Sequence, residues 1–390
     1  MGLKLIAVLV SGLALASCAN GPRTAEIPPV QSEMIESLHA QLKDDVVGYA
    51  FALGTDAQFV GAGGLARSAA DGGPLPFSAD TPMVIASASK LISAIATMKL
   101  LQDQGLKIEE PIGPYFPSDW RVDPYLQSIT FKQLLNQTSG IKDFGNGPMP
   151  YDRLKAFFEQ STSPQSNIAC KDPIDETQPV RVTPSDLGFC YSNFNAGILV
   201  VLLPKLAGFE GEANTAARPK VLAAQYELLV QTKVFAPVGV SDAACAPDGD
   251  DHALSYIYGV DAPGKDWGEQ YDRCAEGGWY VSVRSLAKVL ASIVNKDERI
   301  LIETRAYSSF GEMREFGLGL DRNWPDLMEK GGVLGDEPGV LATSAMIFAP
   351  DSDNPLPAVL FTNSTNAAGR IAHPRHYLQK AYEDAQVVRD

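Results

Sequence analysis

Ser87 and Lys90 stand three residues apart at the start of a long apolar run, VIASASKLISAIATMKLLQDQG. In a helix that begins at Ser87, residues i and i+3 share one face, so the Lys90 amine can reach the Ser87 hydroxyl. A serine beside a base is a nucleophile for carbonyl groups, and the unpaired N–H groups of a first helical turn favour negative charge. The pair therefore predicts acyl transfer, with a serine cap and a solvated lysine as the ordinary alternative.

Two further short motifs follow in the chain, Tyr-Ser-Asn at 191–193 and Lys-Gly-Gly at 330–332. After Ser-x-x-Lys and in this order, they resemble the motifs of the penicillin-recognising serine hydrolases, the branch with class C β-lactamases, D-alanyl-D-alanine peptidases and related esterases. The flanking stretches ITFKQLLNQTSGI, EGGWYVSVRSLAKVL and FGLGL are similar to those of the family as well. The resemblance covers residues 46–363 and implies the β-lactamase/transpeptidase-like fold.

The resemblance implies a role for each polar side chain of these motifs. Ser87 would attack a carbonyl and form an acyl-enzyme, while Lys90 and Tyr191 would share the proton transfers, with the formal base left open between them. Asn193 would hold the lysine or the substrate amide by hydrogen bonds. Lys330 would favour the tyrosinate and the developing oxyanion. The ordinary alternatives are a loop asparagine and an exposed lysine at the end of a strand.

Backbone groups and glycines complete the implied site. The N–H groups of Ser87 and Val333 would form the oxyanion hole, where one donor is worth about 3–4 kcal/mol, and Gly331 and Gly332 would bind substrate. The usual threonine of the third motif, whose hydroxyl helps to bind the carboxylate of β-lactams and D-alanyl peptides, is Gly331 here. This form resembles the esterases of the branch, so we expect ester hydrolysis first, D-amino-acid peptidase activity second and β-lactamase activity third. The retained Lys330 still allows an anionic substrate.

A non-catalytic binding module of the cell envelope on the same fold is the alternative from another class of function. The complete set of Ser, Lys, Tyr and Lys favours an enzyme, because a binding module has no physical need for four costly polar side chains in one cleft. The sequence has no G-x-S-x-G elbow, which argues against the α/β-hydrolase route. No cofactor or metal is implied, since no CxxC pair occurs and His373 and His376 suit a surface helix start. We expect a small ester, amide or peptidoglycan-like substrate and a monomer.

The elements that must position these residues follow from hydrophobic periodicity. The spacing predicts a helix over 30–44 and a hairpin with strands over 46–53 and 59–67. The second strand is rich in glycine, but no helix follows it, so it does not form a dinucleotide-binding site. Residues 87 to about 220 are mainly helical. Beyond them we expect two further helices and four short strands, the helices over 281–294 and 375–387 and the strands over 316–323, 327–332, 341–350 and 357–363.

Strands at both ends of the chain with helices between them predict an α+β fold, an antiparallel sheet flanked by helices with an inserted, mainly helical region. We expect one serine hydrolase domain over 30–390. Its sheet part takes about 30–86 and 275–390, and its helical part about 87–274. The active site would lie in the cleft between the two parts.

The composition is that of an ordinary globular protein, with 45% hydrophobic and 20% charged residues. The formal net charge is −15 at pH 7, and the pI is about 4.8. Nucleic-acid surfaces need clustered Lys and Arg to displace counterions. The acidic balance therefore argues against a nucleic-acid partner and suits a small substrate.

The first 17 residues have a signal-peptide layout, with one lysine followed by an apolar run over 5–15 that is too short to span a membrane. The stretch LASC at 15–18 resembles the lipobox of bacterial lipoproteins. That resemblance implies cleavage before Cys18, acylation of its thiol, and a tether over 18–29 that joins the domain to a membrane. We expect a protein of the bacterial cell envelope, facing the periplasm or the exterior; a plain secretory signal is the alternative.

Four cysteines remain in the mature chain, and an exported protein with an even number of cysteines is expected to form disulfides. Four cysteines allow three pairings. We favour Cys170 with Cys190 and Cys245 with Cys274, because each pair closes one insertion-like segment. A disulfide at Cys190 would stiffen the loop that carries Tyr191.

Overall fold

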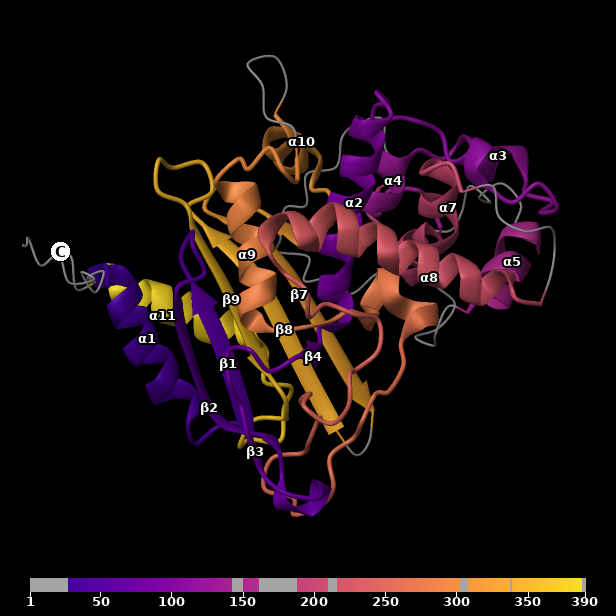
Figure 1. Ribbon diagram of the computed structural model, residues 1–390. Coiled ribbons are helices and arrows are strands. Elements are labelled where there is room, and N and C mark those ends of the chain that lie inside the picture. Colours follow the sequence, from indigo (N-terminus) through magenta and orange to yellow (C-terminus); the bar gives the residue numbers. More distant parts are fainter. Residues whose placement is uncertain are drawn as a thin grey trace, which may run out of the picture.

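One seven-stranded antiparallel sheet, in the order β3-β2-β1-β9-β8-β7-β6, forms the centre of the computed structural model. The structure describes residues 27–141, 150–160, 188–209, 216–301, 308–336 and 339–387. The strands of the sheet are β1 Gly48–Leu53, β2 Phe59–Arg67, β3 Leu75–Pro76, β6 Arg322–Asn323, β7 Leu327–Asp336, β8 Gly339–Phe348 and β9 Leu356–Thr362 (Figure 1).

The sheet joins the two ends of the chain, as the sequence predicts. Strand β1 pairs with β9, and Ala50 lies opposite Phe361. Every residue of β9 is buried, which fits a central strand covered on both faces. Strand β2 pairs with β1 as the expected hairpin. Its Gly61 lies against the Phe51 ring, where an added Cβ would come within 2.2 Å of Cζ, so this glycine serves packing.

Helices cover both faces of the sheet (Figure 1). The first and last helices, α1 Pro29–Leu42 and α11 Pro374–Val387, pack together on one face, and Ser37 of α1 donates a hydrogen bond to Asp384 of α11 at 3.0 Å. In α1 the side chains spaced for one helical stripe are buried: Val30, Met34, Leu38 and Leu42. Helix α9 Val283–Val294 packs on the other face, against β1, β8 and β9.

The helical region lies beside the sheet, on the side away from α1 and α11 (Figure 1). Its helices are α2 Ser89–Asp103, α3 Pro124–Ser128, α4 Phe131–Leu135, α5 Tyr151–Gln160, α6 Asn193–Gly197, α7 Leu199–Leu206 and α8 Arg218–Val230. A short two-stranded sheet, β4 Met83–Val84 with β5 Tyr280–Val281, lies next to this region. Almost every side chain of α2 is buried, so this helix forms the core that both parts of the domain share.

Several predicted boundaries differ from the structure. Strand β7 extends to Asp336 instead of ending at residue 332, and two further differences lie close to the candidate site. The α-helix does not begin at Ser87, because Ala86–Ala88 form a separate 3-10 turn and α2 starts at Ser89. The predicted strand over 316–323 is reduced to the two residues of β6, which follow α10 Ser309–Phe316. Gly317 and Gly319 adopt positive φ angles of 67° and 71°, a conformation that turns the chain instead of extending it.

The cysteines are described in part. Cys245 and Cys274 form a disulfide with their Cα atoms 5.5 Å apart, as predicted. Cys190 is disulfide-bonded too, but Cys170 lies outside the described residues, so its pairing stays a prediction. Cys18, the predicted signal peptide and most of the predicted tether also lie outside them. In the part of the chain that the structure describes, no helix combines the length and apolar character that a membrane span requires.

Candidate active site

Ser87 lies in the tight turn Ala86–Ala88 that leads into α2. Its neighbours on both sides are buried, whereas Ser87 itself is partly accessible. Ala86 has a φ of 49°, in the left-handed region that costs a residue with a side chain about 1–2 kcal/mol. Strained backbone of this kind is typical of functional positions. The turn thus exposes one hydroxyl on an otherwise buried segment.

Lys90 brings its amine to this hydroxyl from the first turn of α2. The Lys90 Nζ donates hydrogen bonds to Ser87 Oγ at 3.1 Å, to Asn193 Oδ1 at 2.9 Å and to the carbonyl oxygen of Glu276 at 2.7 Å. The lysine is 4% exposed. Three acceptors match the three hydrogens of an ammonium, so the amine has a fixed position beside Ser87.

Tyr191 reaches the same hydroxyl from the other side, with its Oη 2.9 Å from Ser87 Oγ. The neutral phenol donates this hydrogen bond, and a tyrosinate would accept it from the serine. The segment that carries Tyr191 is held by Gln137, which follows α4 and has a φ of 64°. The Gln137 carbonyl accepts from Cys190 N at 2.7 Å, and its side-chain oxygen accepts from Ser192 N at 2.9 Å. Gln137 therefore binds the residues on both sides of Tyr191 through hydrogen bonds, and these bonds fix the direction of the phenol.

Two lysines flank the Tyr191 ring. The Nζ atoms of Lys90 and Lys330 each lie 5.1 Å from the ring centroid. Burial opposes ionisation of the phenol, but the charges of Lys330 and Lys90 outweigh burial and hold the pKa of Tyr191 below its usual value. Burial would also discharge Lys330, yet the Asp321 carboxylate and the Tyr191 oxygen raise the pKa of Lys330 above its usual value. The two lysines therefore make this phenol easier to ionise than an ordinary tyrosine.

Strand β7 closes the site from the sheet side. Gly332 lies so close to the serine turn that an added Cβ would be 2.4 Å from the Ile85 oxygen and 2.7 Å from Ser87 N. The next residue, Val333, lines the same pocket as Ser87. At Gly331 an added Cβ would find its nearest neighbour at 3.5 Å, so the structure leaves room for the side chain that this position lacks.

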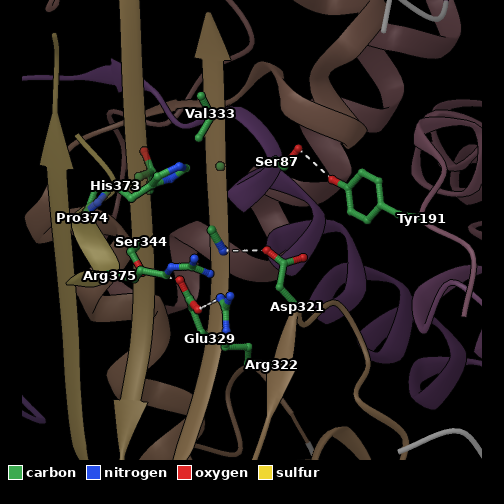
Figure 2. A pocket seen from close by; sticks show the side chains of 13 residues that line it. Ser87, Tyr191, Asp321, Arg322, Glu329, Val333, Ser344, His373, Pro374 and Arg375 are labelled. Atoms are coloured by element: carbon green, nitrogen blue, oxygen red, sulfur yellow. Dashed lines mark hydrogen bonds and ion pairs between the residues drawn. The ribbon is translucent and has the colours of Figure 1, made fainter. Parts of the chain in front are cut away.

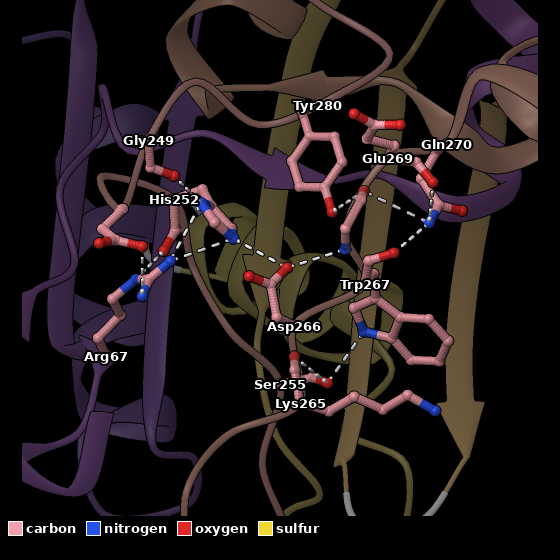
Figure 3. Close-up of polar contacts among 12 residues, drawn as sticks. Arg67, Gly249, His252, Ser255, Lys265, Asp266, Trp267, Glu269, Gln270 and Tyr280 are labelled. Atoms are coloured by element: carbon pink, nitrogen blue, oxygen red, sulfur yellow. Dashed lines mark hydrogen bonds and ion pairs between the residues drawn. The ribbon is translucent and has the colours of Figure 1, made fainter. Parts of the chain in front are cut away.

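These residues open into a pocket of about 290 Å³ that continues along β7 toward the start of α11 (Figure 2). The structure brings all the polar residues predicted from the sequence together at this pocket or directly behind it. Within the described ranges, no group of three or more His, Cys, Asp or Glu side chains is placed to hold a metal ion. The lining residues are Ser87, Tyr191, Asp321, Arg322, Glu329, Gly331, Gly332, Val333, Thr343, Ser344, His373, Pro374 and Arg375.

The sequence prediction missed several residues of the site. Asp321 forms an ion pair with Lys330, and Arg322 forms one with the buried Glu329. The sequence did contain a signal for Asp321, because two consecutive strand-like runs separated by a turn are expected to pair with each other. In the structure this pairing lets the Asp321 N–H donate to the Glu329 carbonyl oxygen at 2.9 Å. Gln137 gave no such signal, since its role depends on a loop conformation.

Comparison with known proteins agrees with this geometry. The sequence profile of the beta-lactamase family matches residues 34–382. No curated protein matches the chain significantly. Among solved structures, the chain is similar to a beta-lactamase/D-alanine carboxypeptidase from Yersinia pestis complexed with citrate, with a TM-score of 0.62, 17% identity, and coverage of 92% of this chain and 99% of that one.

Two further solved structures show the same fold. A class C beta-lactamase from Rhodobacter sphaeroides has a TM-score of 0.58 and 17% identity over 92% of this chain and 99% of that one. An octameric penicillin-binding protein homologue from Pyrococcus abyssi has a TM-score of 0.61 and 18% identity over 92% of this chain and 76% of that one. With the profile match across most of its length and the β-lactamase/transpeptidase-like fold, the chain belongs to the beta-lactamase family.

Proposed function

We propose that the protein is a serine hydrolase that acts on an ester or amide carbonyl through an acyl-enzyme on Ser87. One observation carries the proposal: the Ser87 hydroxyl lies within hydrogen-bond distance of both Lys90 Nζ, at 3.1 Å, and Tyr191 Oη, at 2.9 Å. A nucleophile with a base in reach and a second group that orients it is the arrangement that covalent catalysis requires.

The proton transfers follow from the charges around Tyr191. Because its pKa is lowered by Lys330 and Lys90, we assign the base to Tyr191. The tyrosinate takes the Ser87 proton as Oγ forms a bond to the carbonyl carbon, and the carbonyl π electrons move to its oxygen. The backbone N–H groups of Ser87 and Val333 are our candidates to stabilise that oxyanion. When the tetrahedral intermediate collapses, the leaving alcohol or amine takes the proton from Tyr191.

Water then completes the cycle by the same route in reverse. Tyr191, again a tyrosinate, takes a proton from a water molecule that attacks the acyl carbon, and Ser87 leaves with that proton. Lys90 keeps its hydrogen bonds to Asn193 and to the Glu276 carbonyl through both halves. It therefore holds the serine in position and supplies positive charge.

The proposed substrate order places esters first, then D-amino-acid peptides, then β-lactams. The reason is Gly331, which offers no hydroxyl to a substrate carboxylate. A site that lacks this hydroxyl has less preference for substrates that carry the carboxylate. The two family members from Rhodobacter sphaeroides and Yersinia pestis are described as β-lactamases, the second also as a D-alanine carboxypeptidase. A class C-like β-lactamase is thus the alternative.

Two experiments test this function. A fluorophosphonate probe should label the mature protein at Ser87 and should not label Ser87→Ala; a protein that stays unlabelled would be a binding module on this fold. The ratio of kcat/KM for a p-nitrophenyl ester and for a chromogenic cephalosporin then ranks the substrates. Cephalosporin turnover faster than ester turnover would reverse our order.

We also propose that the protein is a monomer held at the cell envelope by a lipid on Cys18. The disulfide Cys245–Cys274 supports export, because structural disulfides persist in oxidising compartments. A fatty-acid label incorporated into the full chain, and lost in Cys18→Ala, would establish the anchor. A secreted protein without lipid would refute it.

A further inference from the structure

Asp321 satisfies the two groups of β7 that a substrate carboxylate would use. One carboxylate oxygen forms the ion pair with Lys330 Nζ, and the other accepts a hydrogen bond from Gly331 N at 3.0 Å. Figure 2 shows the Asp321 carboxylate directed at β7 beside Ser87 and Tyr191. A cation and a neighbouring backbone N–H form a ready site for an anion, and the protein fills this site with a carboxylate of its own.

The accessible charge at this place is negative. The Asp321 side chain is 31% exposed, whereas that of Lys330 is 2% exposed. Asp321 lines the pocket, and Lys330 is not among the residues that line it. A substrate entering the pocket therefore meets a carboxylate, and the ammonium lies behind it. Gly331 adds no side-chain donor, and its backbone N–H is already bonded to Asp321.

The pocket is also lined by Arg322, Glu329 and Arg375. Arg322 pairs with Glu329, whose other oxygen accepts from Ser344 Oγ at 3.0 Å. Figure 2 shows Arg375 beside this pair. Arg322 thus already has a carboxylate partner of its own.

We infer that Asp321 determines specificity in the proposed hydrolase: it acts as an internal carboxylate in the place of a substrate carboxylate, so the site takes substrates whose leaving group is uncharged. The inference rests on the proposed function and narrows its substrate class to neutral esters. A substrate anion would have to displace Asp321 from Lys330 or approach it as a like charge, and both lower the rate of acylation.

The test compares two esters that differ in one group. Their leaving groups are nearly equal in size, and m-acetoxybenzoate carries a carboxylate where m-acetoxybenzamide carries a neutral amide. We expect the mature wild-type protein to prefer the benzamide in kcat/KM. In Asp321→Asn the ratio of benzoate to benzamide should rise about tenfold or more, because the like charge is gone and Lys330 can accept the substrate. The ratio cancels any general change in catalysis.

Asp103→Asn is the matched control. Asp103 lies at the end of α2, its side chain is 27% exposed, and it pairs with Lys99 and Lys233 at 2.7 Å each. Removal of this distant and screened charge should leave the ratio within about twofold of wild type. Fluorophosphonate labelling of Ser87 checks that each variant is folded, and Asp321→Ser replaces Asp321→Asn if that variant is not.

The outcomes separate the two proposals. A wild-type protein that prefers the benzoate, or a ratio that Asp321→Asn and Asp321→Ser leave unchanged while Ser87-dependent turnover persists, overturns the inference alone. A wild-type protein that is labelled at Ser87 but cleaves neither ester also overturns the inference alone. If the fluorophosphonate does not label wild type at Ser87, or if Ser87→Ala still cleaves the esters, the proposed function fails and the inference fails with it.

Discussion

Gly332→Ala tests whether the contact between β7 and the serine turn positions the reaction centre. A Cβ at this position would lie 2.4 Å from the Ile85 oxygen, 2.7 Å from Ser87 N and 2.8 Å from Ala88 N. All three neighbours are backbone atoms, so no side chain can rotate away to make room. Since ordinary contact begins near 3.4 Å, the strand and the turn must separate by about 1 Å.

This displacement changes the distance between the Ser87 turn and the Val333 N–H across the pocket. A misplacement of about 1 Å costs on the order of 100-fold in rate, so we expect kcat/KM of Gly332→Ala for a neutral ester to fall by that factor. The assay is steady-state hydrolysis of the p-nitrophenyl ester, with thermal unfolding to show that the variant is folded.

Gly335→Ala is the control on the same strand. Its added Cβ would find Val340 Cγ2 at 3.5 Å, an ordinary contact, and the residue lies toward the exposed end of β7. We expect activity within about threefold of wild type, as for most surface substitutions. A Gly332→Ala variant as active as Gly335→Ala would refute the reasoning that the close approach of β7 sets the geometry of the site.

Lys330→Met removes one of the two cations beside Tyr191, so the pKa of Tyr191 rises and less tyrosinate is present at a given pH. The rising limb of kcat/KM against pH should therefore move to higher pH, and a limb that stays in place would assign the base to another group. Cys245→Ala with Cys274→Ala removes a crosslink between residues 29 apart and should lower the free energy of unfolding by about 3–4 kcal/mol in the chain-entropy account. Urea unfolding measures this, and an unchanged midpoint contradicts the stabilising role.

The sheet and its two outer helices were predictable because their patterns are periodic. The apolar stripe of α1 repeats every three to four residues, and β9 is a continuous apolar run. The turn at Ala86–Ala88 was not predictable, since its left-handed residue is an alanine, and nothing in the side chain indicates that conformation. The length of β6 was overestimated because the sequence does not show that Gly317 and Gly319 adopt positive φ angles.

The residues of the candidate site were predictable from three motifs, but their partners were not. Ser87, Lys90 and Tyr191 meet as expected. The Glu276 carbonyl that holds Lys90 is a backbone group, so no side-chain pattern reveals it. The pairing of Lys330 with Asp321 changes the interpretation of the third motif, because a lysine expected to bind a substrate anion already has a carboxylate.

Charge balance links this pairing to catalysis. Lys90 and Lys330 both lie 5.1 Å from the Tyr191 ring, and buried cations are costly unless they are paired. The formal charges of two ammonium groups, one tyrosinate and one aspartate carboxylate sum to zero, and this is the balance that the proposed mechanism uses. A neutral ester preserves that balance, whereas a substrate carboxylate would add one uncompensated negative charge beside an oxyanion that is itself about to form. In the specificity that we propose, the carboxylate that keeps Lys330 charged therefore also sets which substrates the reaction centre accepts.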